Sequence, residues 1–466
     1  MSALWTAAQA ARATDGETTR DWSASGISID TRTLQPGDLF VALTAARDGH
    51  EFVAQALDMG AVAALVSYRP ENVARDAPLL IVPDVQAGLE DLGRAGRART
   101  TAKVLAITGS VGKTSAKDMA RAALAPLGKV HAAQASYNNH WGVPLTLARM
   151  PVDTDFAVIE IGMSNPGEIA PLARLAKPDV ALITTVAPAH LEAFGSLTEI
   201  AEEKASVFEG LSAGAGTAVI NADLATTGVL EARARARNLT ILRFGYRESA
   251  SWRMLDTDTG ERATTMRANS PEGKFSVTLA APGEHVAQNA LGVLAACHAL
   301  GAPLGGLIDG IGAWCPPTGR GTRELVPFPG GDLILIDDAF NSNPASLAAS
   351  LDVFALLQGA DRKILILGDM MELGPAEVGL HTDIAAHPTL SQIAKVHCVG
   401  SRMAHLWSVL PKAKRGEQAA IAEEMLPRLP DLIEPGDAVL IKGSKGSRVS
   451  LCVDRLRALG LETSVQ

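Results

Sequence analysis

The sequence predicts an α/β protein that is built from three domains. The chain has 466 residues, and at about 150 residues per domain this length suggests roughly three hydrophobic cores. Short β-branched apolar runs alternate with helical patterns in two series, as expected of buried parallel sheets with helices on both faces. A stretch rich in glycine and proline, residues 302–325, separates the two series. We therefore expect domains at residues 1–83, 84–314 and 315–466.

Apolar runs mark the expected strands of each domain. The first domain is a small α/β unit, and the helical pattern of residues 84–98 leads from it into the central domain. The third domain repeats the alternation of strand and helix. The expected strands lie at residues 37–43, 61–67 and 79–85 in the first domain, at 104–108, 156–161 and 180–186 in the central domain, and at 333–338, 363–369 and 438–443 in the third.

Composition and charge argue against several classes of function. A net charge of −9 and an aromatic content of 4% argue against a nucleic-acid partner, because such partners need a positive surface and, for single strands, stacking rings. The four cysteines include no C-x-x-C pair, so neither a zinc site nor a disulfide framework is indicated. The first residues lack the pattern of a signal peptide, and no apolar stretch approaches about 18 residues. We expect a cytoplasmic protein without membrane insertion.

A strand that runs directly into a glycine-rich loop and a helix is the strongest local signal. The glycines let backbone N–H groups point at phosphate oxygens, and the helix N-terminus adds the positive end of its dipole. Lys113 can neutralise phosphate charge, and the Thr114 hydroxyl can hold Mg²⁺. The usual first glycine is Ile107 here, and the alternative is an ordinary turn between strand and helix. The predicted phosphate loop consists of Gly109, Ser110, Val111, Gly112, Lys113, Thr114 and Ser115.

Other polar residues of the central domain allow two interpretations each. Glu160 ends the apolar run that starts at residue 156. At the carboxyl end of a parallel strand it can bind a metal ion beside the phosphate loop, or simply meet solvent. His190 follows the next strand and is either a hydrogen-bonded loop residue or part of the same site. His285 and Asn289 begin another helix, where polar residues are common in the first turns.

Lys204 lies on the apolar side of a predicted helix. Ser196 and Glu199 have the spacing of a capping box that starts this helix. A buried ammonium group is costly unless it is paired or neutralised. Lys204 is therefore either a lysine whose ammonium reaches water along the helix surface or a lysine with a changed charge at a working site. The apolar residues that recur with it at helical spacing are Leu197, Ile200, Phe208 and Leu211.

Polar residues also follow strands in the third domain. The run 333–338 ends in Asp338, and Asn341 follows in the next loop. Asn343 precedes a proline, which is typical of a helix N-cap with proline at the first helical position. Asp338 and Asn341 come before that cap and are freer to meet a ligand. No G-x-G-x-x-G follows a strand, so a nicotinamide-binding function is unsupported.

Together these segments resemble the Mur ligase family over nearly the whole chain. The phosphate loop fits the family's variant, which lacks the first glycine. The motifs are most similar to those of the member that joins D-alanyl-D-alanine to UDP-N-acetylmuramoyl-tripeptide. The matching segments are residues 136–146, 158–169, 189–204, 282–290, 337–346, 367–374 and 442–448.

The resemblance implies a fold and an activity for each part of the chain. It implies an N-terminal UDP-sugar domain, a central P-loop ATPase domain with a parallel sheet, and a C-terminal Rossmann-like ligase domain that binds the amine substrate and contacts the nucleotide. The implied cofactors are ATP and Mg²⁺, and the implied substrates are UDP-N-acetylmuramoyl-tripeptide and D-alanyl-D-alanine. An amide bond would form through an acyl phosphate, in peptidoglycan synthesis. A monomer is expected, and the third residue of the tripeptide, diaminopimelate or lysine, stays open.

The resemblance also implies the residues of a catalytic centre. Lys204 matches a lysine that is carbamylated in the family, so that CO₂ addition turns the cation into an anion whose oxygens can meet Mg²⁺. Arg320 matches a linker arginine that reaches the phosphates. The implied catalytic residues are Lys113, Lys204, His190 and Arg320, and the implied metal ligands are Thr114, Glu160, His190 and Lys204.

Further contacts are implied for the nucleotide and the UDP-sugar substrate. Asn289 would contact adenine, Asp338 the ribose and Asn341 the base region. In the first domain, Thr31 stands where relatives often have serine, and Arg32 follows it. The implied substrate contacts are Thr31, Arg32, Asp48, Gly49, His50, Asn138 and Asn139.

Three alternatives are weighed against this interpretation. A folylpolyglutamate synthase-like ligase shares the phosphate loop and the lysine but lacks the UDP-sugar domain, which residues 1–83 supply. The relative that adds meso-diaminopimelate carries an Asp-Asn-Pro-Arg tetrapeptide that this sequence does not contain. A P-loop ATPase switch of the GTP-binding type would need a base-reading Asn-Lys-x-Asp, which is also missing from the sequence.

Overall fold

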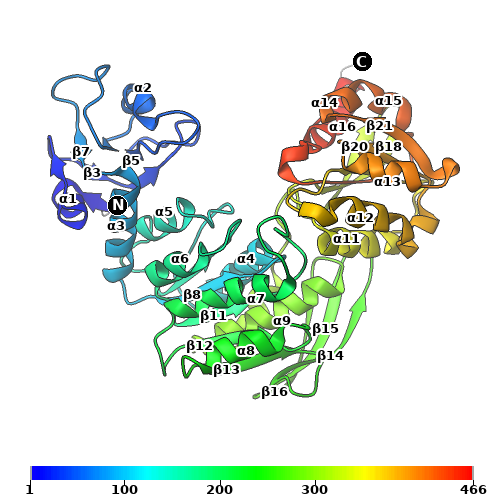
Figure 1. Ribbon diagram of the computed structural model, residues 1–466, viewed down its shortest axis with the longest axis horizontal. Coiled ribbons are helices and arrows are strands. Elements are labelled where there is room, and N and C mark those ends of the chain that lie inside the picture. The colour runs from blue at the N-terminus through cyan, green and yellow to red at the C-terminus, as the bar shows by residue number, and fades with distance from the viewer. Residues whose placement is uncertain (1–2, 464–466) are drawn as a thin grey trace.

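The computed structural model describes residues 3–463, which form three domains that each have their own β-sheet. In Figure 1 the N-terminal and C-terminal domains stand on opposite ends of the central domain and lie apart from each other, which gives the molecule the outline of a V. The predicted α/β class with three domains is confirmed. The predicted boundaries at 83/84 and 314/315 fall in connections between the sheets.

The N-terminal domain is a five-stranded sheet with helices on both faces. Its strand order is β2-β7-β6-β5-β4, and only the pair β2–β7 is antiparallel. Leu39 and Leu65 pack with Leu89 of α3 on one face, while Phe40 packs with Val53 of α2 on the other. The strands are β2 (Glu17–Thr18), β4 (Gly26–Ser28), β5 (Asp38–Val41), β6 (Ala63–Val66) and β7 (Leu79–Ile81); a ribbon of β1 (Trp5–Thr6) and β3 (Ser23–Ala24) and the helices α1 (Ala7–Thr14), α2 (Val53–Asp58) and α3 (Val85–Ala98) complete the domain.

The central domain has a nine-stranded sheet in the order β16-β15-β14-β13-β12-β11-β8-β10-β9. Strands β8 to β14 are parallel, and β15 and β16 extend the sheet by antiparallel pairing. The strands are β8 (Lys103–Thr108), β9 (Val130–Ala132), β10 (Phe156–Glu160), β11 (Val180–Ile183), β12 (Thr217–Asn221), β13 (Thr240–Gly245), β14 (Trp252–Thr259), β15 (Thr264–Ser270) and β16 (Gly273–Leu279). The helices are α4 (Lys113–Leu124), α5 (Gly142–Ala148), α6 (Ile169–Ala176), α7 (Leu197–Ala205), α8 (Thr227–Arg235), α9 (Glu284–Ala299) and α10 (Leu304–Gly312).

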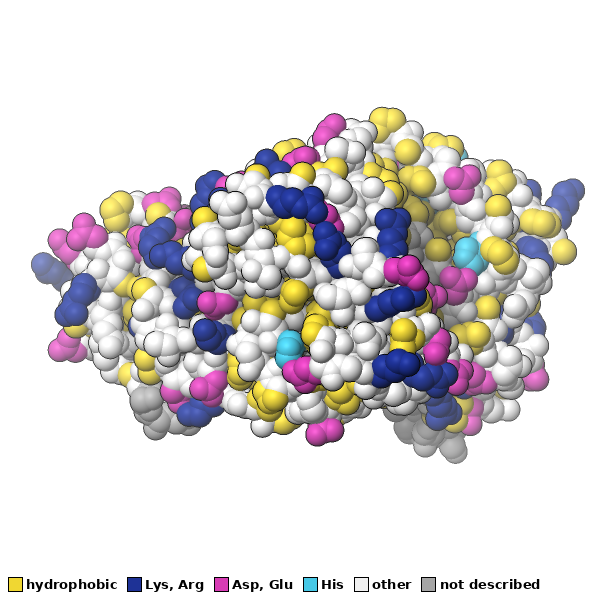
Figure 2. Space-filling view, turned by 90° about the horizontal axis from the view of Figure 1, so that it is seen from below, with side chains coloured by type: hydrophobic (Ala, Val, Ile, Leu, Met, Phe, Trp, Pro, Cys, Tyr) yellow, Lys and Arg dark blue, Asp and Glu magenta, His cyan; other side chains and the backbone are white. Residues whose placement is uncertain are grey.

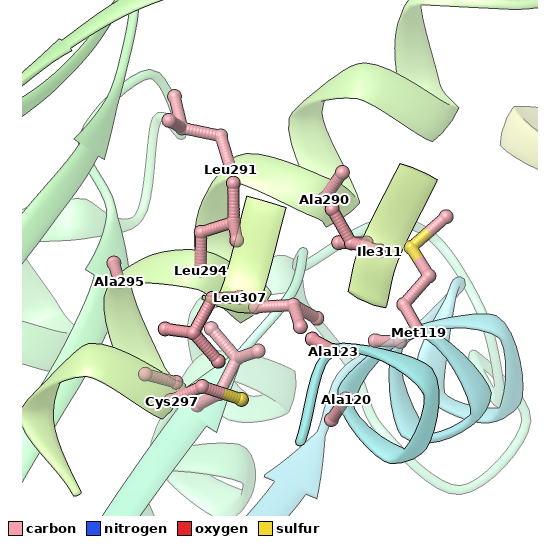
Figure 3. Close-up of a cluster of buried hydrophobic side chains, with 14 of the residues drawn as sticks. Met119, Ala120, Ala123, Ala290, Leu291, Leu294, Ala295, Cys297, Leu307 and Ile311 are labelled. Carbon is pink, nitrogen blue, oxygen red and sulfur yellow. The ribbon is translucent and has the colours of Figure 1, made fainter. Parts of the chain in front are cut away.

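Helices α4, α9 and α10 share one face of the central sheet. Figure 3 shows Met119 and Ala123 of α4 beside Leu294 of α9 and Leu307 of α10 in one buried cluster. Small residues let these helices approach closely, since a Cβ on Gly310 would lie 2.5 Å from the Ala122 carbonyl oxygen. This packing fixes the position of α4 and, with it, the end of the phosphate loop that precedes this helix.

Helices α3 and α5 join the N-terminal domain to the central domain. A Cβ on Gly96 of α3 would lie 2.3 Å from the carbonyl oxygen of Leu147 in α5, so the two helices nearly touch. Leu145 of α5 belongs to the same core cluster as the N-terminal sheet. The Trp5 indole donates a hydrogen bond to the Ala148 carbonyl at 2.8 Å. The N-terminal domain therefore packs directly on the central domain.

The C-terminal domain has a six-stranded sheet in the order β17-β18-β22-β19-β20-β21. Only β17 is antiparallel to its neighbour. The strands are β17 (Thr322–Phe328), β18 (Gly331–Asp338), β19 (Lys363–Gly368), β20 (Lys395–Val399), β21 (Arg415–Ala419) and β22 (Ala438–Lys442). The helices are α11 (Pro344–Leu356), α12 (Glu377–Thr382), α13 (Met403–Val409), α14 (Ala422–Met425), α15 (Leu429–Leu432) and α16 (Ser450–Thr463).

The antiparallel edge of the central sheet was not predicted. Strand β15 alternates between buried residues and residues that are half-buried or exposed, and its buried positions include Thr264, Met266 and Ala268. Such a one-sided strand lacks the β-branched apolar run of a strand that is buried on both faces. The sequence pattern therefore predicted the parallel strands and not this antiparallel edge.

The described residues contain no helix that is both long and apolar enough to cross a membrane. On the face in Figure 2, Lys and Arg side chains stand among Asp and Glu side chains over much of the surface.

Candidate active site

The phosphate loop runs from the end of β8 to the start of α4. Gly112, the N-cap of α4, has a φ of +87°, a left-handed conformation that favours glycine. A Cβ at Gly112 would lie 2.7 Å from Nδ2 of Asn289, so a larger residue there would also displace the Asn289 side chain. Lys113 Nζ donates to the Gly109 carbonyl at 2.7 Å. Burial lowers the pKa of Lys113, and the Glu160 carboxylate opposes that shift.

Glu160 and Thr114 form a buried oxygen cluster next to this loop. Oε1 of Glu160 accepts hydrogen bonds from Thr114 Oγ1 at 3.1 Å and from Asn138 Nδ2 at 2.7 Å. Oε2 is buried and has no hydrogen-bond partner among the described residues. Because an unpaired buried carboxylate oxygen is costly, a bound cation would stabilise it. The Thr114 hydroxyl and the Glu160 carboxylate are the hard oxygen ligands that Mg²⁺ prefers, so these residues fit that ion.

Within the described residues, no three His, Cys, Asp or Glu side chains gather into a metal cluster. A cation beside Glu160 would therefore need oxygens from hydroxyl groups, water or a bound phosphate. Mg²⁺ usually binds proteins in this way, through one or two carboxylates and the phosphates of a substrate.

Arg320 reaches the phosphate loop from the linker between the central and C-terminal domains. Its Nη2 donates to Thr114 Oγ1 at 3.0 Å and to Ser136 Oγ at 3.4 Å. The guanidinium lies over the ring of Phe340, 4.3 Å from the ring centre. Burial lowers the pKa of Arg320, while the Glu160 and Asp338 carboxylates raise it. Two cations, Lys113 and Arg320, therefore lie beside a loop that is shaped for phosphate.

A cavity of about 370 Å³ opens between the central and C-terminal domains at this point, and we call it the interdomain cavity. Most of the residues that were predicted to meet the nucleotide line it. They are Ser110, Val111, Gly112, Lys113, Thr114, Ser115, Asn289, Arg320, Asp338 and Asn341, whereas Gly109 does not line the cavity. The predicted metal ligand Glu160 and the predicted substrate contact Asn138 line it as well. The fold thus brings predicted residues of two domains, which are more than 200 positions apart in the sequence, to one site.

Lys204 is buried, with 1% of its surface exposed. The interpretation in which its ammonium group reaches water is therefore wrong. Its Nζ lies 4.0 Å from the sulfur of Met163. Burial lowers the pKa of Lys204 well below its usual range, and the positive charge of Lys113 adds to that effect. Lys204 does not line the interdomain cavity. It lies close enough to the phosphate loop for the two lysines to repel each other.

The start of helix α7 differs in one detail from the predicted capping box. Ser196 is the N-cap, and its Oγ accepts from the Glu199 N–H at 3.2 Å as predicted. Glu199 Oε2, however, accepts from the N–H of Gly195 at 3.0 Å rather than from the N–H of Ser196. Helix α7 ends at Ala205, so Phe208 and Leu211 of the predicted stripe lie beyond it, and both are buried.

His190 contacts the C-terminal domain and does not line the interdomain cavity. Its Nδ1 lies within ion-pair distance of the Glu372 carboxylate, and this contact with His190 lowers the pKa of Glu372. The N–H of Glu192 donates to the Glu372 carbonyl at 3.3 Å. Both His190 and Glu372 have a positive φ, 59° and 63°, which is uncommon for residues other than glycine. Two strained loops therefore meet across the domain boundary here.

Family models cover most of the chain. The model of the Mur ligase family, catalytic domain, matches residues 23–102, that of the Mur ligase middle domain matches 107–297, and that of the Mur ligase, glutamate ligase domain, matches 324–445. UDP-N-acetylmuramoyl-tripeptide–D-alanyl-D-alanine ligase of Escherichia coli (strain K12) is 34% identical over 445 residues, which are 94% of this chain and 95% of that protein. The chain belongs to the Mur ligase family.

Other Mur ligases are similar over the same length. The ligase of the same name from Rickettsia prowazekii is 30% identical over 452 residues, with 97% of this chain and 99% of that protein covered. A crystal structure of MurF from Acinetobacter baumannii has a TM-score of 0.83 at 27% identity and covers 97% of this chain and 99% of that one. The three-domain architecture of this Mur ligase is thus shared from end to end.

In this Mur ligase the N-terminal domain carries a separate polar cluster, which we call the Asp48 cluster: Asp48, His50, Ser67 and Tyr68. Asp48 Oδ1 accepts from His50 Nδ1 at 2.7 Å, and Oδ2 accepts from the Tyr68 hydroxyl at 2.8 Å. His50 Nε2 accepts from the Ser67 N–H at 2.9 Å, which places the imidazole proton on Nδ1. The rings of His50 and Tyr68 stack with centres 4.1 Å apart. Gly49, which lies between Asp48 and His50 in the sequence, is buried.

Three other predicted substrate residues lie outside the interdomain cavity. Arg32 has an exposed side chain that pairs with Asp30, and Thr31 precedes it. Asn139 Oδ1 accepts from the N–H groups of Trp141 and Gly142, which fixes the turn before α5. The structure therefore places Asn139 as a turn residue, whereas its neighbour Asn138 meets Glu160 in the cavity.

Several cavity residues were missed by the sequence analysis. Ser136 and Phe340 lie inside segments that carry the family resemblance, but hydroxyl and aromatic side chains in loops give no chemical signal of their own. Lys442 ends strand β22, and Ser350 lies on helix α11. Lys442 also begins the matching segment 442–448, and its position at the carboxyl end of a parallel strand is a second signal that could have identified it.

Proposed function

We propose that this Mur ligase joins D-alanyl-D-alanine to UDP-N-acetylmuramoyl-tripeptide at the expense of ATP, giving UDP-N-acetylmuramoyl-pentapeptide for peptidoglycan synthesis. The observation that carries the proposal is the interdomain cavity, where the phosphate loop, Glu160 and Arg320 converge. Relatives with this activity in their names match the chain over more than nine-tenths of its length.

The proposed reaction has two steps. A carboxylate oxygen of the tripeptide attacks the γ-phosphorus of ATP, the bond from that phosphorus to the β–γ bridging oxygen breaks, and ADP leaves. The amine of D-alanyl-D-alanine then attacks the carbonyl carbon of the acyl phosphate, loses a proton, and the tetrahedral intermediate expels phosphate. The first step brings a carboxylate to a polyphosphate. Lys113 and Arg320 offset the repulsion between these anions and stabilise charge in the transition state.

We assign the nucleotide as follows. The phosphates would lie on the N–H groups of the phosphate loop, with Asn289 toward the base and Asp338 toward the ribose. Thr114 and Glu160 would hold Mg²⁺, which supplies Lewis-acid polarisation of the phosphoryl oxygens when bound. The unpaired Oε2 of Glu160 supports this assignment.

We propose that Lys204 acts as a carbamate. Only the neutral amine reacts with CO₂, and burial lowers the pKa of Lys204 well below its usual range. The modification would remove a buried positive charge and add oxygens that suit a hard cation. His190 would approach the reacting phosphates only after it leaves Glu372.

The Asp48 cluster favours the UDP-sugar ligase over a folylpolyglutamate synthase-like ligase. It lies in an N-terminal domain that the latter class lacks, and it combines hydrogen-bonding groups with an exposed aromatic ring. We propose that Asp48, Gly49, His50, Thr31 and Arg32 lie at or beside the UDP-muramoyl site.

The test is a product assay. The pure protein is incubated with ATP, Mg²⁺, D-alanyl-D-alanine and, in separate reactions, each UDP-muramoyl-tripeptide with diaminopimelate or lysine at position three. We expect ADP formation that requires both the tripeptide and the dipeptide, and a pentapeptide product by mass. ATP hydrolysis that ignores both substrates would favour a P-loop ATPase switch, and glutamate addition to folate would favour the folylpolyglutamate synthase-like class.

A further inference from the structure

Asp338, the proposed ribose contact, is held on one side by two donors. Its Oδ2 accepts from Lys442 Nζ at 2.7 Å and from Ser350 Oγ at 2.5 Å. In the described part of the chain no hydrogen bond reaches Oδ1 of Asp338. Asp338 lines the interdomain cavity. One carboxylate oxygen is therefore fixed by the protein, and the other is left as an acceptor for a ligand.

The register of the C-terminal sheet creates this ion pair. Strands β18 and β22 are parallel neighbours inside the sheet, and Asp338 lies directly opposite Lys442 at their carboxyl ends. The side chain of Lys442 is 3% exposed and that of Asp338 is 15% exposed. A buried ammonium with a matched carboxylate has little freedom to move, because leaving either charge without its partner is strongly unfavourable.

Lys442 holds a second element of the cavity as well. Its Nζ donates to the carbonyl oxygen of Asn341 at 3.0 Å. Two residues further on, Ser444 Oγ donates to the Ser342 carbonyl at 3.2 Å. The end of β22 thus fixes the loop that follows β18, and this loop contains Asn341, the proposed contact to the base region.

We propose that Lys442 is a positioning residue for recognition of the nucleoside. It holds Asp338 by Oδ2 so that Oδ1 accepts a hydrogen bond from a ribose hydroxyl, and it holds the Asn341 backbone beside the base. The inference rests on the proposed ATP site and goes beyond it, because it assigns the selection of the ribose to a lysine that need not touch the phosphates. Lys113 and Arg320 already serve the phosphates from the central domain and the linker.

The test compares binding of ADP, 2′-deoxy-ADP and 3′-deoxy-ADP by calorimetry. The proteins are the wild type, Lys442→Met, Asp338→Asn and the double variant. Since a hydrogen bond to a charged group is among the stronger ones, the wild type should prefer ADP over at least one deoxy analogue by about 10-fold. Lys442→Met should reduce this preference to below about threefold, as should Asp338→Asn. The double variant should reduce it no further, because residues in direct contact are not additive.

Two further variants control the experiment. Lys395→Met removes an exposed lysine from the start of β20 in the same domain and should keep the full preference. Ser350→Ala removes the other donor to Oδ2 and should lower the preference in part. If Lys442→Met does not fold, as judged by thermal unfolding, Ser350→Ala decides: an unchanged preference would overturn the idea that anchoring at Oδ2 orients Asp338.

The outcomes separate this inference from the proposed function. A Lys442→Met protein that binds ADP more weakly but keeps the wild-type preference would mean that Lys442 acts on affinity alone, and the inference would be wrong. A wild type that binds ADP without any preference for its ribose would overturn the inference as well. A wild type that binds no ADP would instead contradict the proposed ATP site.

Discussion

The Asp48 cluster and the interdomain cavity are both built around a carboxylate. All residues of the Asp48 cluster come from one domain, whereas the interdomain cavity needs residues of two domains. Asp48, His50 and Tyr68 hold one another through contacts that span only 20 positions of the chain. In the cavity, Arg320 meets Thr114 across 206 positions. The Asp48 cluster is therefore preformed within its domain, whereas the cavity depends on how the C-terminal domain docks.

Docking of the C-terminal domain rests on a few polar contacts beside the linker. Glu261, between β14 and β15, accepts from Arg323 Nη1 at 2.9 Å and from the Gln358 N–H at 3.0 Å. On the other side, His190 pairs with Glu372. Partly exposed ion pairs contribute little individually. We therefore expect the cavity to change its shape more easily than the Asp48 cluster, which cannot change without breaking the local structure.

The largest expected effect is that of Lys113→Ala. Lys113 offsets phosphate charge, so we expect turnover to fall by at least about 100-fold, with binding of UDP-muramoyl-tripeptide in the N-terminal domain retained. Turnover is measured by ADP release and binding by calorimetry. Lys129→Ala, at a side chain that is 69% exposed, is the matched control and should keep full turnover. Near-normal turnover of Lys113→Ala would contradict the phosphate-loop assignment.

Lys204→Ala should also lose turnover by about 100-fold while still binding UDP-muramoyl-tripeptide, because the proposed carbamate supplies metal ligands and not substrate contacts. Formate or acetate should fill the vacated space and restore part of the rate. Recovery is read from initial rates over a series of carboxylate concentrations, with alkylamines as the matched additives. Recovery by alkylamines alone would mean that the cation itself is required, and full activity without any additive would mean that Lys204 is structural.

A smaller effect is expected at the docking contact. Glu261→Ala removes both hydrogen bonds of the hairpin to the C-terminal domain. Because such a pair is worth about 1 kcal/mol or less, the KM for ATP should rise by no more than about fivefold. Binding of UDP-muramoyl-tripeptide alone should not change. Glu248→Ala, at a residue whose side chain is 91% exposed, serves as the control; equal effects of the two variants would remove Glu261 from the docking of this domain.

Local patterns explain which parts of these regions could be predicted. The phosphate loop follows its strand directly, and Lys204 stands within one helical stripe, so each signal lies within about 15 consecutive residues. The strand ends with Glu160 and Asp338 could also be predicted, since the carboxyl ends of parallel strands bind ligands. In each case the residue and its structural context are neighbours in the sequence.

The missed features depend on contacts between distant segments. The pairing of Lys442 with Asp338 follows from a strand order in which β22 lies beside β18, across 104 positions of the chain. His190 was placed at a site near the phosphates, but its loop contacts Glu372 of another domain. No periodicity or motif encodes such partners, because the first pair arises only when the C-terminal sheet assembles and the second only when two domains pack.

The smallest predicted effect concerns the preformed region. The His50 N–H, the His50 side chain and the Tyr68 hydroxyl lower the pKa of Asp48 to about 2. A carboxylate whose pKa is lower in the folded state stabilises the fold above its unfolded pKa, and this contribution is lost as the pH falls toward the folded value. The wild type should therefore lose more unfolding free energy than Asp48→Asn between about pH 5 and about pH 2.

The size of this difference is limited by solvent. Because the Asp48 side chain is 36% exposed, screening should keep the difference at or below about 1 kcal/mol. Urea unfolding at several pH values measures it, with Asp76→Asn, at an exposed carboxylate of the same domain, as the control. ADP binding should be the same in Asp48→Asn and the wild type, since the cluster is complete within its own domain. A loss of ADP affinity in this variant would mean that the two regions are coupled through α3 and α5, and the contrast between a preformed cluster and a docked cavity would not hold.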